Sequence, residues 1–173
     1  MSKSKQDHFL QLYQTVHDRF ERFCRARACG DMPFEDLMNE TLLIAYQKID
    51  DLQKEGAFLS FLIGISLRIL ANNKRKKKAS PAADESILLN YADPEDVMTK
   101  KFDVALLHKA LALLPEEQRE ALILFEITGF SIKEIMEIQD SSESAVKQRL
   151  VRGRKALASI VKKELSYKPG GTI

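Results

Sequence analysis

Apolar side chains recur along this chain at spacings of three and four residues, which is the periodicity of helices rather than strands. In the first half, the pattern predicts three helices. Their inner sides are expected to carry Phe9, Leu12, Tyr13, Val16, Phe20 and Phe23; then Phe34, Leu37, Met38, Leu42, Ala45, Ile49 and Leu52; then Phe58, Phe61, Leu62, Ile65 and Ile69. Asp50–Gly56 is a polar, acidic loop, and the third helix runs into a basic cluster. The fold is predicted to be all-α.

The second half of the chain contains several signals for the start of a helix. Asp93–Asp96 and Pro115–Glu117 each place a proline followed by acids where the first turn of a helix favours them. Ala79–Glu85 is small and polar and is typical of a linker. We therefore expect two small helical domains, residues 1–79 and 103–173, joined by an acidic linker at 80–102. The C-terminal domain ends in a short tail.

Ser131 to Leu157 has the pattern of a helix-turn-helix. Gly129 suits the end of the preceding helix, and Ser131 with Glu134 forms the capping box that starts the next one. Asp140–Ser142 then favours a turn, since these side chains bond to nearby backbone. The second helix of the pair begins after this turn.

That second helix has one apolar stripe and is basic almost everywhere else. The stripe contains Val146, Leu150, Gly153, Leu157 and Ile160. The opposite face carries Ser144, Gln148, Val151, Arg152 and Lys155, flanked by Lys147, Arg149 and Arg154. Gly153 lies in the stripe, which suggests the close approach of another helix. A basic helix alone would fit a solvated face, but the capping box and turn favour DNA binding.

The distribution of charge is more informative than its sum, which is only +2. Lys74–Lys78 is an unbroken basic run, whereas Asp31–Ala57 has seven acids against two lysines. Ala79–Thr99 has five acids and neither Lys nor Arg. This segregation suggests different partners at different places.

Other classes of function have little support. No apolar run approaches membrane-spanning length, and no N-terminal segment looks like a signal peptide. Cys24 and Cys29 imply no disulfide framework, so a reduced, cytoplasmic setting is expected. A metal site at His17 and Cys24 is conceivable, but buried or solvated side chains fit better. No catalytic constellation or cofactor site is visible, so we expect no enzyme activity.

The chain resembles bacterial RNA polymerase sigma factors of the extracytoplasmic-function group, which keep conserved regions two and four. Phe34–Glu40 is similar to the region-two pattern "AEDLVQE", and Phe58–Ile65 to "F..WL..I". The region-four pattern is carried by Leu114-Pro115 through Arg119, Glu134-Ile135, Val146-Lys147, Arg149-Leu150, Arg152 and Arg154. The resemblance covers roughly residues 9–78 and 104–160. Both regions in order are specific, whereas region four alone is shared by many regulators.

The resemblance implies a promoter-recognition factor with two DNA-binding surfaces. The upstream (minus-thirty-five) element would meet Ser144, Lys147, Gln148, Val151 and Arg152, with Arg149 and Arg154 on phosphates or in a structural role. The downstream (minus-ten) element, once melted, would meet Leu52, Ile65, Arg68, Asn72, Arg75 and Lys76. A flipped base would enter a pocket walled by the Asp50–Gly56 loop with Leu52, Ile65 and Arg68, although Leu52 and Ile65 fit plain core equally well.

The resemblance also implies protein partners. The clamp helices of the polymerase β′ subunit would be gripped by Asp36, Asn39, Glu40, Leu43 and Tyr46. The acidic segment Asp84–Asp96 would thread toward the polymerase active cleft. Whether an anti-sigma factor is a further partner stays open.

Four residues depart from the family pattern, and two alternative functions remain. Phe61 stands where Trp is usual, Arg68 where Asn is common, Asp140 for the turn Gly, and Gly153 for Ala. The first alternative is a free-standing helix-turn-helix regulator that acts without polymerase. The second is a helical interaction module whose basic helix meets an acidic protein. The first leaves the basic run after the third helix and the region-two pattern unexplained, and the second predicts no base preference.

Overall fold

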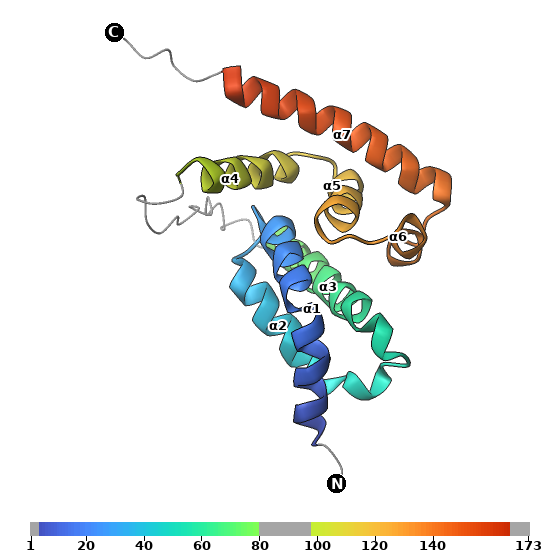
Figure 1. The fold of residues 1–173 in the computed structure, drawn as a ribbon. Helices are drawn as coiled ribbons and strands as arrows, with labels where there is room; N and C mark the ends of the chain where they lie inside the picture. The colour runs from blue at the N-terminus through green and yellow to red at the C-terminus, as the bar shows by residue number, and fades with distance from the viewer. Residues whose placement is uncertain (1–3, 80–97, 167–173) are drawn as a thin grey trace. The chain divides into compact units, whose positions relative to one another are not determined.

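The computed structural model describes residues 4–79 and 98–166, and every regular element in these ranges is helical (Figure 1). The described residues divide into two compact units, one built on α1–α3 and the other on α4–α7. This confirms the all-α prediction. The exact domain bounds stay a prediction, because most of the expected linker, including Asp84–Asp96, lies outside the described residues.

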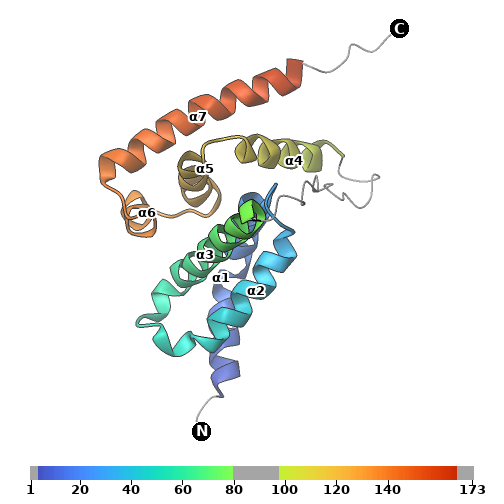
Figure 2. The same cartoon turned by 180° about the vertical axis from the view of Figure 1, so that it is seen from behind.

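The N-terminal unit packs three helices, α1 (Lys5–Ala28), α2 (Phe34–Gln47) and α3 (Phe58–Ala79), side by side (Figures 1 and 2). The predicted stripes supply the core, in which Phe20, Phe23, Leu37 and Leu62 are fully buried. Ser4 caps α1 by accepting a hydrogen bond from the amide of Asp7. The helices therefore form where the apolar spacing predicted them.

Polar contacts fix the end of α3 that carries the basic run. Arg27, buried near the end of α1, bonds the Asp31 carboxylate at 2.8 Å. The carbonyl of Asp31 accepts bonds from Asn73 and Lys77 on α3. The turn between α1 and α2 thus holds the basic end of α3 in a defined position, and the lysine run is part of the helix.

The connection between α2 and α3 differs from the predicted plain loop. Helix α2 ends at Gln47, and two 3-10 turns follow, Ile49–Asp51 and Glu55–Ala57. Ile49 is buried as predicted, but it belongs to the first of these turns rather than to α2. Two contacts of 2.8 Å tie these turns to α1, from Lys5 Nζ to Asp50 and from His8 Nε2 to Glu55.

Helix α3 raises the question of membrane insertion. By length and composition, Glu55–Ala79 is apolar enough to cross a bilayer, contrary to the expectation that no run reaches that length. Its side chains Phe58, Leu62 and Ile63 are instead buried within the N-terminal unit, where α3 contacts α1 and α2. The central helix of a small bundle passes the same test of composition.

Between residues 98 and 166, the C-terminal unit contains four α-helices and one π-helical turn. The helices are α4 (Met98–Ala112), α5 (Glu116–Leu122), α6 (Ile132–Gln139) and α7 (Glu143–Ser166). Pro115 precedes α5 as predicted, whereas the start signal at Asp93–Asp96 falls outside the described residues. Helix α5 continues into the π-helical turn Ile123–Ile127, which the periodicity did not predict.

The helix-turn-helix prediction is confirmed in detail. Ser131 and Glu134 form the full capping box of α6, and Gly129 before it has a φ of 80°. Asp140 ends α6 in the left-handed region with a φ of 46°, a conformation that Asp tolerates better than most residues. The hydroxyl of Ser142 then accepts a bond from the amide of Ala145 and caps α7.

Candidate nucleic-acid interface

Burial of the apolar stripe determines which side of α7 is exposed to solvent. Val146, Leu150 and Gly153 are buried, and α7 packs against α5. A Cβ atom at Gly153 would lie 2.9 Å from Cδ1 of Leu122, closer than real Cβ contacts allow. Gly153 therefore lies where α7 closely approaches α5, as its place in the stripe suggested, and a methyl group added here would require the Leu122 side chain to shift. With that stripe buried, the basic face is left to the outside.

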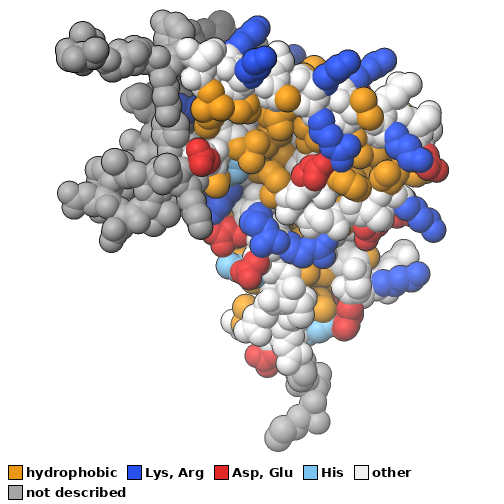
Figure 3. Space-filling model, turned by 45° about the horizontal axis from the view of Figure 1, so that its top comes forward, with side chains coloured by type: hydrophobic (Ala, Val, Ile, Leu, Met, Phe, Trp, Pro, Cys, Tyr) orange, Lys and Arg blue, Asp and Glu red, His pale blue; other side chains and the backbone are white. Residues whose placement is uncertain are grey.

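Five predicted upstream-element residues share this outer face. Ser144, Lys147, Gln148, Val151 and Arg152 are all exposed. The last four line a shallow depression of about 260 Å³. Val151 has 62% of its surface exposed, so its methyl groups are available for contact with another molecule. Lys and Arg side chains stand out from this part of the molecule in Figure 3.

The other two predicted residues, Arg149 and Arg154, are held by contacts within the C-terminal unit. Arg149 bonds Gln139 at 3.0 Å, Ser141 at 2.7 Å and the Glu117 carboxylate at 3.1 Å. Arg154 bonds the Glu126 carboxylate at 2.6 Å. The bonds of Arg149 attach α7 to α5 and α6, which gives this arginine a structural role in the free chain. The exposed ion pair of Arg154 joins α7 to the π-helical turn.

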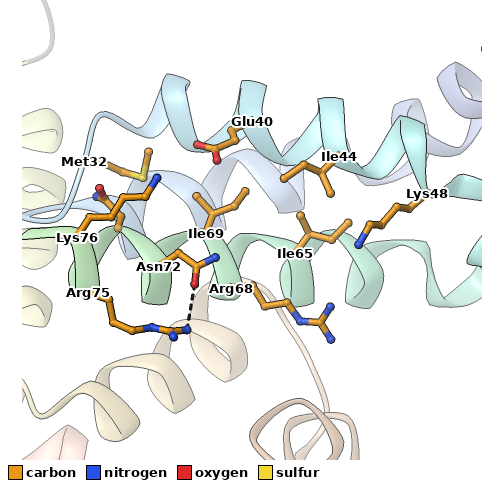
Figure 4. Close-up of a pocket in the computed structure, with 11 residues that line it drawn as sticks. Met32, Glu40, Ile44, Lys48, Ile65, Arg68, Ile69, Asn72, Arg75 and Lys76 are labelled. Carbon is orange, nitrogen blue, oxygen red and sulfur yellow. Dashed lines mark hydrogen bonds between the residues drawn. The ribbon is translucent and has the colours of Figure 1, made fainter.

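The second candidate surface is a groove of about 490 Å³ between α2 and α3 (Figure 4). The groove is lined by Met32, Glu40, Ile44, Lys48, Ile65, Arg68, Ile69, Asn72, Asn73, Arg75 and Lys76. Five of the six residues predicted for the downstream element are in this set; Leu52 is not. The residues that sequence spacing grouped on α3 thus line one groove, and the structure supplies the opposite wall from α2. Their role in binding the downstream element stays a prediction.

The groove has an apolar floor and a cationic rim. Ile44, Ile65 and Ile69 lie between the two helices, and the longer polar side chains surround them in Figure 4. Lys48 and Arg68 are exposed and make no ion pair with any residue that the structure describes. Such a groove can receive the flat face of a base on its floor and phosphates at its rim.

The predicted pocket, in which the Asp50–Gly56 loop lies beside Arg68, differs from the groove that Arg68 lines. No residue of that loop lines it, and the wall across from the Arg68 side comes from α2 and includes Lys48. Lys48 was missed because it follows the last turn of α2 and belongs to no motif. The signal that could have found it is its charge, one of only two lysines in the acidic stretch Asp31–Ala57.

The outer face of α2 presents the residues predicted to meet polymerase. Asp36, Asn39, Glu40, Leu43 and Tyr46 are all exposed, at spacings that place them on one side of the helix. Leu43 has 59% of its surface exposed. Glu40 also lines the groove and therefore stands at the border of the two surfaces.

The cysteines and histidines do not add a reactive site. Cys24 is buried and Cys29 partly buried, and both are free thiols. Burial raises the pKa of the Cys24 thiol, so it stays protonated and unreactive near neutral pH. The His17 ring contacts the carboxylates of Asp18 and Glu21, and no group of side chains suited to a metal ion occurs among the described residues.

Both units of the chain match protein-family models. "Sigma-70 region 2" matches residues 12–80 and "Sigma-70, region 4" matches residues 105–157. The sigma factor SigM of Mycobacterium tuberculosis is 27% identical over 154 residues, which cover 88% of this chain and 76% of SigM. The sigma-E factor of Escherichia coli K12 is 27% identical over 140 residues, covering 74% and 72%. Both relatives are described as extracytoplasmic-function factors.

Two solved structures share the fold. The sigma factor RpoE of Bartonella quintana, in complex with the anti-sigma factor NepR, superposes with a TM-score of 0.75 at 24% identity, covering 90% of this chain and 97% of RpoE. CnrH, in complex with the cytosolic domain of CnrY, gives a TM-score of 0.67 at 21% identity, covering 91% and 90%.

Proposed function

The chain belongs to the extracytoplasmic-function group of sigma-70 factors, and from that premise we propose how its two units divide the work. It is a transcription initiation factor, which binds core RNA polymerase and recognises promoter DNA. A free-standing helix-turn-helix regulator is the less favoured alternative, because it leaves the region-two match over residues 12–80 without a purpose.

The C-terminal unit reads the upstream promoter element through the outer face of α7. The observation that supports this is the contrast between Arg152 and Arg149 on one helix: Arg152 is exposed, whereas Arg149 is half-buried and bonds Gln139, Ser141 and Glu117. Arg154 is exposed as well, but it forms an ion pair with Glu126. Lys147, Gln148 and Arg152 can donate to guanine or adenine edges in the major groove, and Val151 can touch a thymine methyl group.

The N-terminal unit receives the melted downstream element in the groove between α2 and α3. A base taken out of its stack costs a few kcal/mol, so a preformed apolar floor and nearby cations must offset that cost. Ile65 and Ile69 supply the floor, and Lys48, Arg68 and Lys76 the cations. The outer face of α2, with Asp36 and Leu43, grips the clamp helices of the polymerase β′ subunit.

The remaining assignments follow from this division of work. The protein supplies binding and strand separation, while the chemistry of RNA synthesis belongs to the polymerase. It acts in the cytoplasm, where polymerase and promoter DNA meet. An anti-sigma factor is a further partner; the solved RpoE and CnrH structures, which share this fold, are complexes with NepR and with the cytosolic domain of CnrY.

Run-off transcription tests the function as a whole. Core polymerase with this protein on genomic fragments is expected to start at defined sites, whereas core polymerase alone starts at none of them. The free chain is expected to bind the same promoter duplexes poorly, because each unit offers only a small basic surface. Tight sequence-specific duplex binding by the free chain with no effect on transcription would support the free-standing regulator instead.

Arg152 and Arg149 form a matched pair for testing which face of α7 reads DNA. Arg152→Ala should relax the base preference at one upstream position at a cost of roughly 1–3 kcal/mol, as for a lost base-reading contact. Arg149→Ala removes the same charge but should lower the unfolding midpoint in urea and weaken all promoters alike, since it breaks bonds to Gln139, Ser141 and Glu117. Equal behaviour of the two variants in holoenzyme assays on base-substituted promoters would contradict the assignment.

A further inference from the structure

The basic outer face of α7 contains one acid. Glu143 is the first residue of α7, and its carboxylate lies 2.5 Å from Nζ of Lys147 one turn later. Both side chains are more than half exposed, at 59% and 57%. The hydrogen bond and charge of Lys147 lower the pKa of Glu143, so the carboxylate is ionised at neutral pH. An acid in the first turn also suits the helix dipole, so its presence alone indicates no contact.

The Glu143–Lys147 pair lies on the side of α7 that carries the proposed DNA-reading residues. Glu143, Lys147 and Val151 follow one another at intervals of four, so they share one side of α7. Lys147 and Val151 line the depression that we assign to the upstream element. A carboxylate on a face that meets phosphates opposes binding, unless it finds a hydrogen-bond donor there. In the major groove the donors are the exocyclic amines of cytosine and adenine.

We propose that Glu143 is a specificity-determining residue, which accepts a hydrogen bond from the N4 amine of a cytosine in the upstream element, while Lys147 donates to the guanine of the same base pair. The proposal rests on the reading role assigned to α7. A G·C pair presents the guanine O6 and N7 acceptors beside the cytosine N4 donor in the major groove. The ion pair offers a donor beside an acceptor and is therefore complementary to that edge.

The same chemistry explains how the wrong base pairs are rejected. Where cytosine is replaced by thymine, the Glu143 carboxylate meets the O4 acceptor and the methyl group instead of an amine. Two acceptors then face each other, and the carboxylate is left without a partner in a desolvated site, which is costly. Glu143 thus adds selectivity mainly by penalising other sequences, rather than by strengthening binding to the best one.

The test uses polymerase holoenzyme on promoters in which each upstream base pair is replaced in turn by the other three. The wild-type protein is expected to prefer G·C at one position, and Glu143→Ala should reduce that preference by roughly tenfold, in the range of one lost base contact. The preference at other positions should not change. Glu164→Ala, which removes the same charge from the exposed far end of α7, is the control and should change nothing.

A double-mutant comparison separates a shared base pair from two independent contacts. If Glu143 and Lys147 read one pair, the double alanine variant should lose no more preference than the worse single variant. A uniform rise in affinity for every sequence in Glu143→Ala would overturn the proposal and make the residue a simple repulsive charge. Unchanged preference and affinity would also overturn it, leaving a solvated ion pair. Absence of specific initiation by the wild-type protein would instead refute the proposed function itself.

Discussion

Replacing Leu43 with aspartate is expected to weaken binding of core RNA polymerase by roughly 100-fold, as the loss of a central apolar anchor does in protein interfaces. Leu43 has 59% of its surface exposed on the outer face of α2, among Asp36, Asn39 and Tyr46. An exposed leucine surrounded by polar residues suits the centre of a contact surface, where it would be desolvated. A charge placed there would have to be buried without a partner.

The fold should tolerate this change, because Leu43 is not part of the core. The thermal midpoint of Leu43→Asp, followed by circular dichroism, should match that of the wild type. Leu10→Asp is the matched control: Leu10, on α1, has 45% of its surface exposed, and the charge introduced is the same. Core binding measured by co-purification or fluorescence anisotropy should fall for Leu43→Asp only. If both variants bind core polymerase normally, the polymerase-binding face lies elsewhere.

Local signals in the sequence predicted most of the secondary structure correctly. The stripes containing Phe20 and Leu62 predicted helices whose apolar sides form the core. Ser131 with Glu134 predicted the start of α6, and Asp140 its end, because capping depends on residues within one or two turns. Gly153 predicted a close helix contact, since a glycine in an apolar stripe has little other use. These features are determined by neighbours in sequence.

What the sequence did not predict depends on packing between distant segments. The π-helical turn Ile123–Ile127 carries no signal of its own, because its apolar residues also fit an ordinary helix. The groove between α2 and α3 forms only when both helices are packed together. Lys48 therefore lies near the groove residues of α3 only in the folded chain, and no local pattern predicts this proximity. The bonds that hold Arg149 within the C-terminal unit likewise involve Glu117 and Gln139, which are 32 and 10 positions away along the chain.

Removing the two unpaired cations on opposite walls of the groove is expected to impair promoter melting more than promoter binding. Lys48→Ala and Arg68→Ala should each reduce open-complex formation by roughly tenfold, about the loss expected when one hydrogen bond to a charged group is removed. The closed complex should be less affected, because the groove is assigned to DNA that is already single-stranded. Arg22→Ala, which removes an exposed charge of α1 that does not line the groove, should leave both steps unchanged.

Permanganate footprinting of unpaired thymines, alongside a duplex-binding assay, separates the two steps. The double variant should lose about as much as the two single variants together, since the side chains come from opposite walls of the groove and would neutralise different phosphates. Each substitution should also reduce the salt dependence of open-complex stability. The slope of log K against log salt concentration should decrease by about the contribution of one phosphate contact. If duplex binding and melting fall equally, the cations are ordinary backbone contacts. If neither falls, Lys48 and Arg68 are solvated, and the melted strand does not follow this groove.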